Sequence, residues 1–366
     1  IRKNNMKSKG KVLLALSGGV DSSVAALLLK KQGYEVIAAF MKCFSDTKNP
    51  LTGECNWIEE RASAQRIASL LKISFITLDF EKQYKKQVLN PMFKGYKQNK
   101  TPNPDITCNT LIKFPLLWKE AQKRKCSLIA TGHYSIIKKT IKRYELHAGK
   151  DQTKDQSYFL YELSQNDLSH TFFPIGKYTK NEVRRIAKKN KFHNWNKKGT
   201  SGICFVGNIY MKNFLQKKIK KKLGLVKDLS GRTIGTHEGS MFYTIGQRVG
   251  SHIGIIIKKT SDEQKKWYIT KKIKNTLFIA PEGHLSLLSN RIIIKSFHRI
   301  NEEEKIPKNL KARIRHLGAL IPCTLKKEKR YYVIILRIPQ RGIAEGQSVV
   351  LYSKGKVIGG GEILLQ

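Results

Sequence analysis

The chain has 366 residues, 40% of them hydrophobic, and 70 lysines and arginines against 27 aspartates and glutamates give it a formal net charge of +43. This length corresponds to two or three domains with a buried core. No run of about 18 apolar residues occurs, which excludes a membrane-spanning helix. The charge favours a polyanionic partner such as nucleic acid, although lysines spread along the whole chain also fit a general compositional bias.

The cysteines indicate reduced thiols rather than a disulfide scaffold. No two of them have C-x-x-C spacing, and residues 1–11 are basic without the apolar core of a secretion signal. We therefore expect a cytoplasmic protein with no structural zinc or iron–sulfur centre and no membrane partner. The six cysteines are Cys43, Cys55, Cys108, Cys126, Cys204 and Cys323.

The N-terminal half predicts strands that alternate with helices. Short apolar runs are typical of buried strands, and amphipathic stretches between them predict helices. This alternation favours an α/β fold with a parallel sheet covered on both faces. The expected strands are 12–16, 34–41, 73–80 and 127–133; the expected helices follow the first strand up to Gly33 and cover 57–72, 110–124 and 180–190, with a loop at 99–109.

The C-terminal half has a different pattern. The stretch 210–224 predicts a basic amphipathic helix, and short apolar runs broken by glycine begin near residue 225. From about 277 onward the pattern is strand-like throughout, which indicates a small β-barrel or sandwich. We expect three domains, at residues 1–206, 207–276 and 277–366.

The first strand runs into the turn S-G-G-V-D-S-S at residues 17–23. A strand, a glycine turn and a helix N-terminus together form an anion site, because glycines let the backbone approach the ligand. The patterns G-x-x-x-x-G-K-[ST] and G-x-G-x-x-G are both absent, which excludes the kinase-type phosphate loop and the dinucleotide loop. A purely structural turn needs one glycine, not two flanked by serines.

The pattern S-G-G-x-D-S resembles the pyrophosphate loop (PP-loop) of adenylating ATPases. Together with five later stretches, it makes nearly the whole chain similar to the bacterial tRNA-specific 2-thiouridylases. The resemblance implies an adenine-nucleotide α-hydrolase-like PP-loop domain, a small mixed central domain and a C-terminal β-barrel. The five stretches are TPNPDITCN (101–109), ATGHY (130–134), KDQSYFLY (154–161), GTSGICFVG (199–207) and TIGQRVG (244–250).

This resemblance implies ATP-dependent 2-thiolation of the wobble uridine of tRNA. ATP would adenylate the C2 oxygen with release of pyrophosphate, which the loop would hold, and a cysteine persulfide would supply the sulfur. The implied partners are tRNA and a persulfide donor, either a cysteine desulfurase or a sulfur relay protein. Magnesium is expected only because pyrophosphate departure usually needs it.

Two cysteines have distinctive settings. Cys108 lies in a polar, proline-containing loop, which favours a reactive group on exposed backbone, whereas Cys204 lies in an apolar stretch typical of an ordinary core strand. The resemblance implies that Cys108 is the nucleophile, Cys204 the persulfide carrier and Asp105 an acid/base, with a transient disulfide between Cys108 and Cys204. A thiol pair suits this chemistry, because a second thiolate can attack a persulfide.

The other four cysteines are assigned no part in this chemistry. Cys126 and Cys323 lie in apolar surroundings typical of packing residues, and Cys43 and Cys55 flank a polar loop.

The remaining site residues are implied by the resemblance alone, and several of them also fit a purely structural role. Met41 also fits a core residue, His133 a structural histidine, and residues 154–156 a solvated loop, while Arg313 and Arg315 alternate along an expected strand and so share a face. The implied ATP contacts are Ala15, Leu16, Ser17, Gly18, Gly19, Val20, Asp21, Ser22, Met41 and Gly132; the implied tRNA contacts are Asn103, Pro104, Asp105, His133, Lys154, Asp155, Gln156, Arg313, Ile314 and Gln347.

Two other functions are weighed against the thiouridylase. An amidating synthetase with the same loop would use ammonia or glutamine and would not need the cysteines. A basic RNA-binding protein with an inactive nucleotide site would need neither the intact loop nor the two cysteine motifs.

Overall fold

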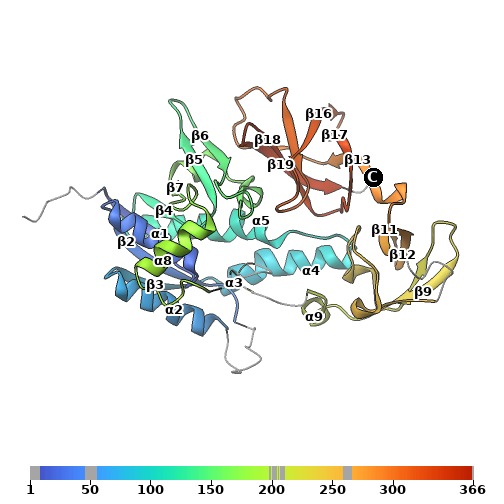
Figure 1. Ribbon diagram of the computed structural model, residues 1–366, viewed down its shortest axis with the longest axis horizontal. Helices are drawn as coiled ribbons and strands as arrows, with labels where there is room; N and C mark the ends of the chain where they lie inside the picture. The colour runs from blue at the N-terminus through green and yellow to red at the C-terminus, as the bar shows by residue number, and fades with distance from the viewer. Residues whose placement is uncertain are drawn as a thin grey trace, which may run out of the picture.

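The computed structural model describes residues 9–45, 56–197, 199, 204, 206, 211–258 and 266–364. These residues form three sheets (Figure 1). A parallel sheet belongs to the N-terminal half, a small mixed sheet follows it, and an antiparallel barrel ends the chain. The expected succession of α/β, small mixed and β-barrel parts is confirmed.

The parallel sheet has the order β3-β2-β1-β4-β7, so the direction of winding reverses beside β1. In open α/β sheets, ligands bind outside the carboxyl ends of the strands at such a reversal. The glycine turn follows β1 and therefore lies at this position. The strands are β1 (Lys11–Ala15), β2 (Glu35–Lys42), β3 (Ser74–Asp79), β4 (Leu128–Ala130) and β7 (Thr171–Phe172).

Helices cover both faces of this sheet. Val12 and Leu14 point into one apolar core, and Leu13 points into the other, as the period-2 alternation of a strand requires. The first core contains α1 (Val20–Lys31), α2 (Asn56–Leu70) and α8 (Lys180–Lys189), the last of which begins at a capping box formed by Thr179 and Glu182. The second core contains α3 (Glu81–Tyr84), η1 (Lys85–Leu89), α4 (Asn90–Lys97), α6 (Phe114–Lys123), η3 (Ser157–Leu160) and α7 (Gln165–Ser169).

The segment 99–109, expected as a loop, contains a helix, α5 (Pro104–Cys108). The Asn103 side chain accepts hydrogen bonds from the backbone N–H groups of Asp105 and Ile106 at 3.2 and 3.4 Å. An asparagine cap followed by proline at the first helical position is a favourable helix start. The helix continues through the π-helical segment η2 (Asn109–Lys113) into α6.

The central sheet has the order β10-β9-β8-β12-β11. The basic stretch before it forms only a short helix, α9 (Met211–Gln216), because the lysine run that follows would place like charges beside one another on a helix surface. Strand β12 spans the expected domain boundary at residue 276, so we propose that the central domain extends to Pro281. Its elements are β8 (Gly224–Lys227), β9 (Thr233–His237), η4 (Ser240–Phe242), η5 (Ser251–Ile253), β10 (Ile255–Ile257), β11 (Trp267–Ile273) and β12 (Thr276–Pro281).

The C-terminal strands close into a barrel. Six strands follow one another in the order β13-β17-β16-β15-β18-β19, and β13 also pairs with β19. Closure leaves these strands no free edge. The elements are η6 (Leu285–Leu287), β13 (Leu288–Ile294), β14 (His298–Arg299), β15 (Leu310–Arg313), β16 (Ile321–Glu328), β17 (Tyr331–Arg341), β18 (Ser348–Ser353) and β19 (Lys356–Leu364).

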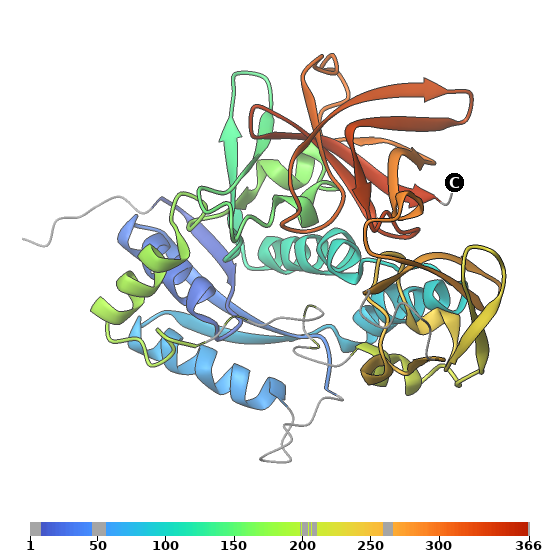
Figure 2. The ribbon, with the colours of Figure 1, turned by 45° about the vertical axis from the view of Figure 1, so that its right-hand side comes forward.

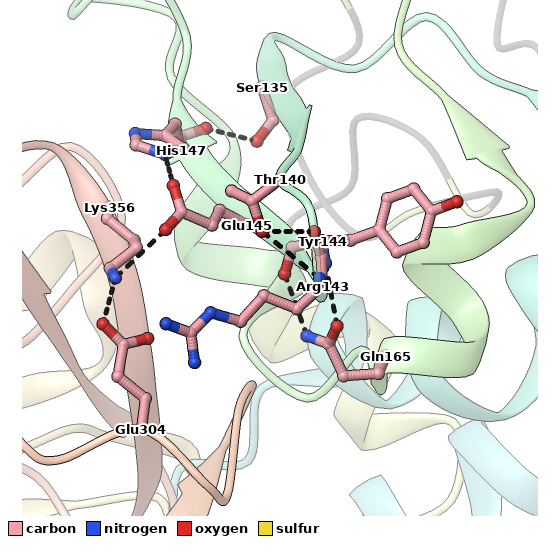
Figure 3. Close-up of polar contacts among 9 residues, drawn as sticks. All are labelled: Ser135, Thr140, Arg143, Tyr144, Glu145, His147, Gln165, Glu304 and Lys356. Atoms are coloured by element: carbon pink, nitrogen blue, oxygen red, sulfur yellow. Dashed lines mark hydrogen bonds and ion pairs between the residues drawn. The ribbon is translucent and has the colours of Figure 1, made fainter.

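A hairpin of the N-terminal half, β5 (Ser135–Lys139) and β6 (Tyr144–Ala148), extends this sheet beside β19 (Figure 2). Figure 3 shows the junction, where Lys356 lies between Glu145 and Glu304. The Lys356 ammonium is 3.3 Å from Glu145, whose other oxygen contacts His147 at 2.9 Å. The hairpin therefore fixes the barrel against the parallel-sheet domain.

A buried ion pair makes a second connection between these domains. The Arg313 guanidinium donates to Asp155 at 2.6 Å, and the two residues are only 4% and 0% exposed. Asp155 also accepts from the backbone N–H groups of Gly149 and Ser157. Both side chains are enclosed by protein and paired with each other, and the expected tRNA contacts at Asp155 and Arg313 stay predictions.

Arg315 does not share the environment of Arg313, contrary to the expected alternation. Strand β15 ends at Arg313, and Arg315 is exposed.

Arg313→Leu should lower the free energy of unfolding by about 3 kcal/mol, because it leaves a buried carboxylate without its partner. Guanidinium denaturation measures this, with Arg315→Leu as the exposed control, for which we expect a change within about 0.5 kcal/mol. Equal effects of the two substitutions would contradict a structural role for the ion pair.

Candidate functional site

The glycine turn requires glycine at residue 18. Gly18 has φ +78°, and a Cβ there would lie 2.4 Å from the carbonyl oxygen of Glu60. The Gly18 carbonyl accepts hydrogen bonds from the Ser63 hydroxyl at 3.0 Å and from the Asn194 amide at 2.9 Å. Neighbouring elements therefore hold the turn in a shape that only glycine adopts without strain.

The turn presents the N-terminus of α1 without a side-chain cap. Gly19 is the N-cap residue, and the hydroxyls of Ser22 and Ser23 donate to its carbonyl at 3.1 and 2.9 Å. Gly132, two residues after β4, packs so closely that a Cβ there would lie 2.8 Å from the Ser22 nitrogen. Uncapped N–H groups and the helix dipole suit an anion at this place.

The turn contains no lysine of its own, but a lysine of another helix contacts it. The Lys180 ammonium, at the start of α8, lies 2.7 Å from both carboxylate oxygens of Asp21, and the Tyr134 hydroxyl donates to one of them at 2.7 Å. Sequence reasoning missed Lys180, because nothing in its local pattern indicates a position 159 residues from its partner.

The described residues contain no cluster of three His, Cys, Asp or Glu side chains that could hold a metal ion. Both oxygens of Asp21, the carboxylate of the turn, already contact a cation. The site in this arrangement does not fit a magnesium ion held by protein ligands alone.

Cys108 and Cys204 meet beside α5. Their thiols are hydrogen-bonded to each other. The backbone N–H of Cys204 donates to Asp105 at 2.8 Å, and the Tyr84 hydroxyl donates to the Cys204 carbonyl at 2.6 Å. The two sulfur atoms are thus brought together by contacts to the main chain of Cys204 as well as by the thiols.

The two thiols differ in their ionisation. Burial raises the pKa of Cys108 well above its usual value, and the hydrogen bond with Cys204 adds to this. The pKa of Cys204 is lowered, first by the hydrogen bond from Cys108 and then, against the effect of burial, by Lys113. Of the two thiols, Cys204 is therefore the one that ionises more readily. The pKa of Asp105 is raised by burial.

Cys43 lies near the same group. Burial raises the pKa of Cys43, and the charge of Cys204 raises it further. Cys126 and Cys323 are buried as expected for packing residues, and Cys55 lies outside the described residues.

A groove of about 290 Å³ runs along another side of α5. It separates α4 and α5 from the start of β18, and the side chains of Lys94 and Lys100 border it. The groove is lined by Asn103, Pro104 and Thr107. The cysteine site and the groove therefore lie on two different sides of α5.

The other expected tRNA residues have varied surroundings. Lys154 is exposed, whereas His133 is buried and its Nδ1 lies 2.6 Å from the Thr131 hydroxyl. The Ile314 side chain is buried in the barrel core, and a tRNA contact at this position stays a prediction. Gln156 accepts a hydrogen bond from the Tyr134 backbone, and Gln347 donates to the Thr101 carbonyl at 2.7 Å.

Met41, expected at an adenine, is buried in the second core at the carboxyl end of β2.

Three known domain families match successive parts of the chain. The tRNA methyl transferase HUP domain matches residues 10–208, the tRNA methyl transferase PRC-barrel domain residues 212–281, and the aminomethyltransferase beta-barrel domain residues 289–363. The fold and its glycine turn define a protein of the PP-loop class.

Curated relatives are similar over almost their full length. The tRNA-specific 2-thiouridylase MnmA 2 of Aliarcobacter butzleri is 38% identical, with 98% of this chain and 99% of the relative covered. The tRNA-specific 2-thiouridylase MnmA of Coxiella burnetii is 39% identical with the same coverage, and that of Buchnera aphidicola is 39% identical with 98% of each chain covered. The chain belongs to the family of the tRNA-specific 2-thiouridylases.

Similarity to solved structures is weak. A 4-thiouridine synthetase in complex with RNA and ATP is 16% identical, with a TM-score of 0.34 over 54% of this chain and 45% of that one.

No helix among the described residues is both long and apolar enough to cross a membrane.

Proposed function

We propose that this protein is a tRNA 2-thiouridylase that uses ATP to replace the C2 oxygen of the wobble uridine with sulfur. The observation that carries the proposal is the hydrogen-bonded pair of Cys108 and Cys204, with Asp105 on the Cys204 main chain, in the same domain as the PP-loop. An amidating synthetase has no need of such a pair. The family descriptions mention methyl transfer, but paired thiols suit sulfur transfer.

In the first half of the proposed reaction, the uridine C2 oxygen attacks the α-phosphate of ATP. A bond from this oxygen to phosphorus forms, and the bond to the departing pyrophosphate breaks. The N-terminus of α1 and the backbone at Gly18 and Gly132 would hold the phosphates, since dipole and close backbone approach both favour an anion there. Lys180 supplies positive charge beside the loop, and magnesium would arrive with the nucleotide.

In the second half, Cys204 carries a persulfide. Its terminal sulfur reaches C2, and AMP leaves with the former uridine oxygen. Attack of the Cys108 sulfur on Cys204 Sγ breaks the persulfide S–S bond and leaves a disulfide, which a thiol reductant returns to two thiols. Asp105 holds the Cys204 backbone and is the nearby acid/base.

The groove beside α5 is the proposed place for the target nucleotide, with Asn103 and Pro104 against the base. Lys94, Lys100 and the exposed Lys154 offer cations for phosphate contacts. We also propose a persulfide donor protein that loads Cys204.

Gly18→Ala should weaken ATP binding by at least about tenfold, because a left-handed φ and a backbone clash must both be relieved. Gly19→Ala should weaken binding much less, since φ there is −83° and the nearest atom would be 3.5 Å from the new Cβ. Calorimetric titration with ATP measures both. Equal affinities for the two variants would show that the turn is not the nucleotide site.

Cys108→Ala and Cys204→Ala should each abolish thiouridine formation while tRNA binding is retained, since the thiols do the chemistry and not the docking. Incubation with ATP, a persulfide donor and unmodified tRNA, followed by nucleoside mass spectrometry, measures this. Cys126→Ala, a buried thiol outside the site, is the control and should stay active. Full activity of Cys204→Ala would refute the persulfide assignment.

A further inference from the structure

Lys113 places a cation on the sulfur of Cys204. It is the last residue of η2, which continues the helix that ends at Cys108. Its ammonium donates to Cys204 Sγ at 3.5 Å and to the Asn109 side-chain oxygen at 3.0 Å. The same continuous helix therefore carries Cys108 and the lysine whose ammonium contacts the sulfur of Cys204.

Several titratable groups surround Lys113. Besides Cys204, the titratable groups that interact with Lys113 include Cys108, Asp105, Cys43 and His133. The carboxylate of Asp105 already accepts the Cys204 backbone N–H. Of the three thiols in the cluster, the hydrogen bond from Lys113 goes to Cys204.

Electrostatics reinforces this geometry. Burial lowers the pKa of Lys113, but the sulfurs of Cys204 and Cys108 and the carboxylate of Asp105 offset this, and the net pKa lies above its usual value. The ammonium therefore stays charged. Burial raises the pKa of Cys43 and of Cys108, whereas the pKa of Cys204 is lowered. The Lys113 ammonium therefore contacts the thiol that ionises most readily of the three.

We infer that Lys113 is a positioning residue that stabilises the Cys204 thiolate and thereby makes Cys204, rather than Cys108 or Cys43, the acceptor of sulfur. This inference rests on the proposed function only in naming the reaction. In that step, the Cys204 thiolate attacks the terminal sulfur of a donor persulfide. A new S–S bond forms on Cys204, the donor S–S bond breaks, and its electron pair leaves on the donor thiolate, which takes a proton from water.

The pH dependence of thiol alkylation tests the inference directly. The full-length protein, Lys113→Met and Lys113→Arg are treated with iodoacetamide between pH 5.5 and 9.5, and peptide mass spectrometry gives the rate at each cysteine. An opposite charge at this distance shifts a pKa by at least about one unit. In Lys113→Met we expect the Cys204 midpoint to rise by that amount, which makes labelling at pH 7 about tenfold slower.

Two controls separate charge from structure. Lys113→Arg keeps the cation and should keep a Cys204 midpoint close to that of the parent protein. Cys323 is buried in the barrel and its pKa is raised to about 12 by burial, so it should stay unlabelled in all three proteins, which shows that the fold is intact. An unchanged Cys204 midpoint in Lys113→Met, or a shift equal to that of Lys113→Arg, would overturn the inference.

A second readout concerns sulfur itself. With glutathione persulfide as the probe, Lys113→Met should load Cys204 about tenfold more slowly at pH 7, seen as the mass of one added sulfur. Equal loading of the two proteins would overturn the inference. Neither readout requires tRNA or ATP, so failure here is distinct from failure of the thiouridine assay.

Discussion

The hydrogen bond from the Cys204 backbone to Asp105 is the contact on which the site depends. Asp105 and Cys108 lie one turn apart on α5 and so share a side of the helix. Because the carboxylate holds the main chain of Cys204 at 2.8 Å, the Cys204 sulfur comes against the Cys108 thiol. Tyr84, from α3, secures the same residue through its carbonyl. Two motifs far apart in sequence thus become one sulfur site.

The short stretch before α5 connects this site to the other two sheets. The Asn99 side chain donates to the Lys274 carbonyl of the central domain at 2.8 Å. Thr101 donates through its backbone to Glu345 at 2.7 Å and accepts from Gln347, both near the barrel strand β18. Movement of either C-terminal domain would therefore act on the cap of the helix that carries Asp105 and Cys108. The buried Asp155–Arg313 pair restrains the barrel from the other side.

Much of the fold could be predicted from the sequence, because local patterns determine it. Apolar runs located β1, β2, β3 and β4 of the parallel sheet but not the two-residue β7, and glycine with serine marked the turn after β1. The expected helix from residue 180 is α8. Even α5 had a local signal, since Asn103-Pro104 is a favourable helix start, but the surrounding polar residues favoured a loop.

The rest depends on contacts between distant segments, which no local pattern contains. Lys180 reaches Asp21 across the sheet edge, and Lys113 reaches Cys204 across the site. The burial of Asp155 follows from the position of the barrel against the first domain, so a polar loop residue became an internal one. The chain is also rich in lysine, and nothing in the local sequence distinguishes Lys113 and Lys180 from the many lysines on the surface.

Mild oxidation tests most directly whether the two sulfurs share one site. The full-length protein is treated with diamide, digested under non-reducing conditions and mapped by mass spectrometry. We expect a peptide in which Cys108 is linked to Cys204, formed before any other disulfide and at a low concentration of oxidant. Linkage of Cys204 to another cysteine, or survival of both thiols while other cysteines oxidise, would contradict it.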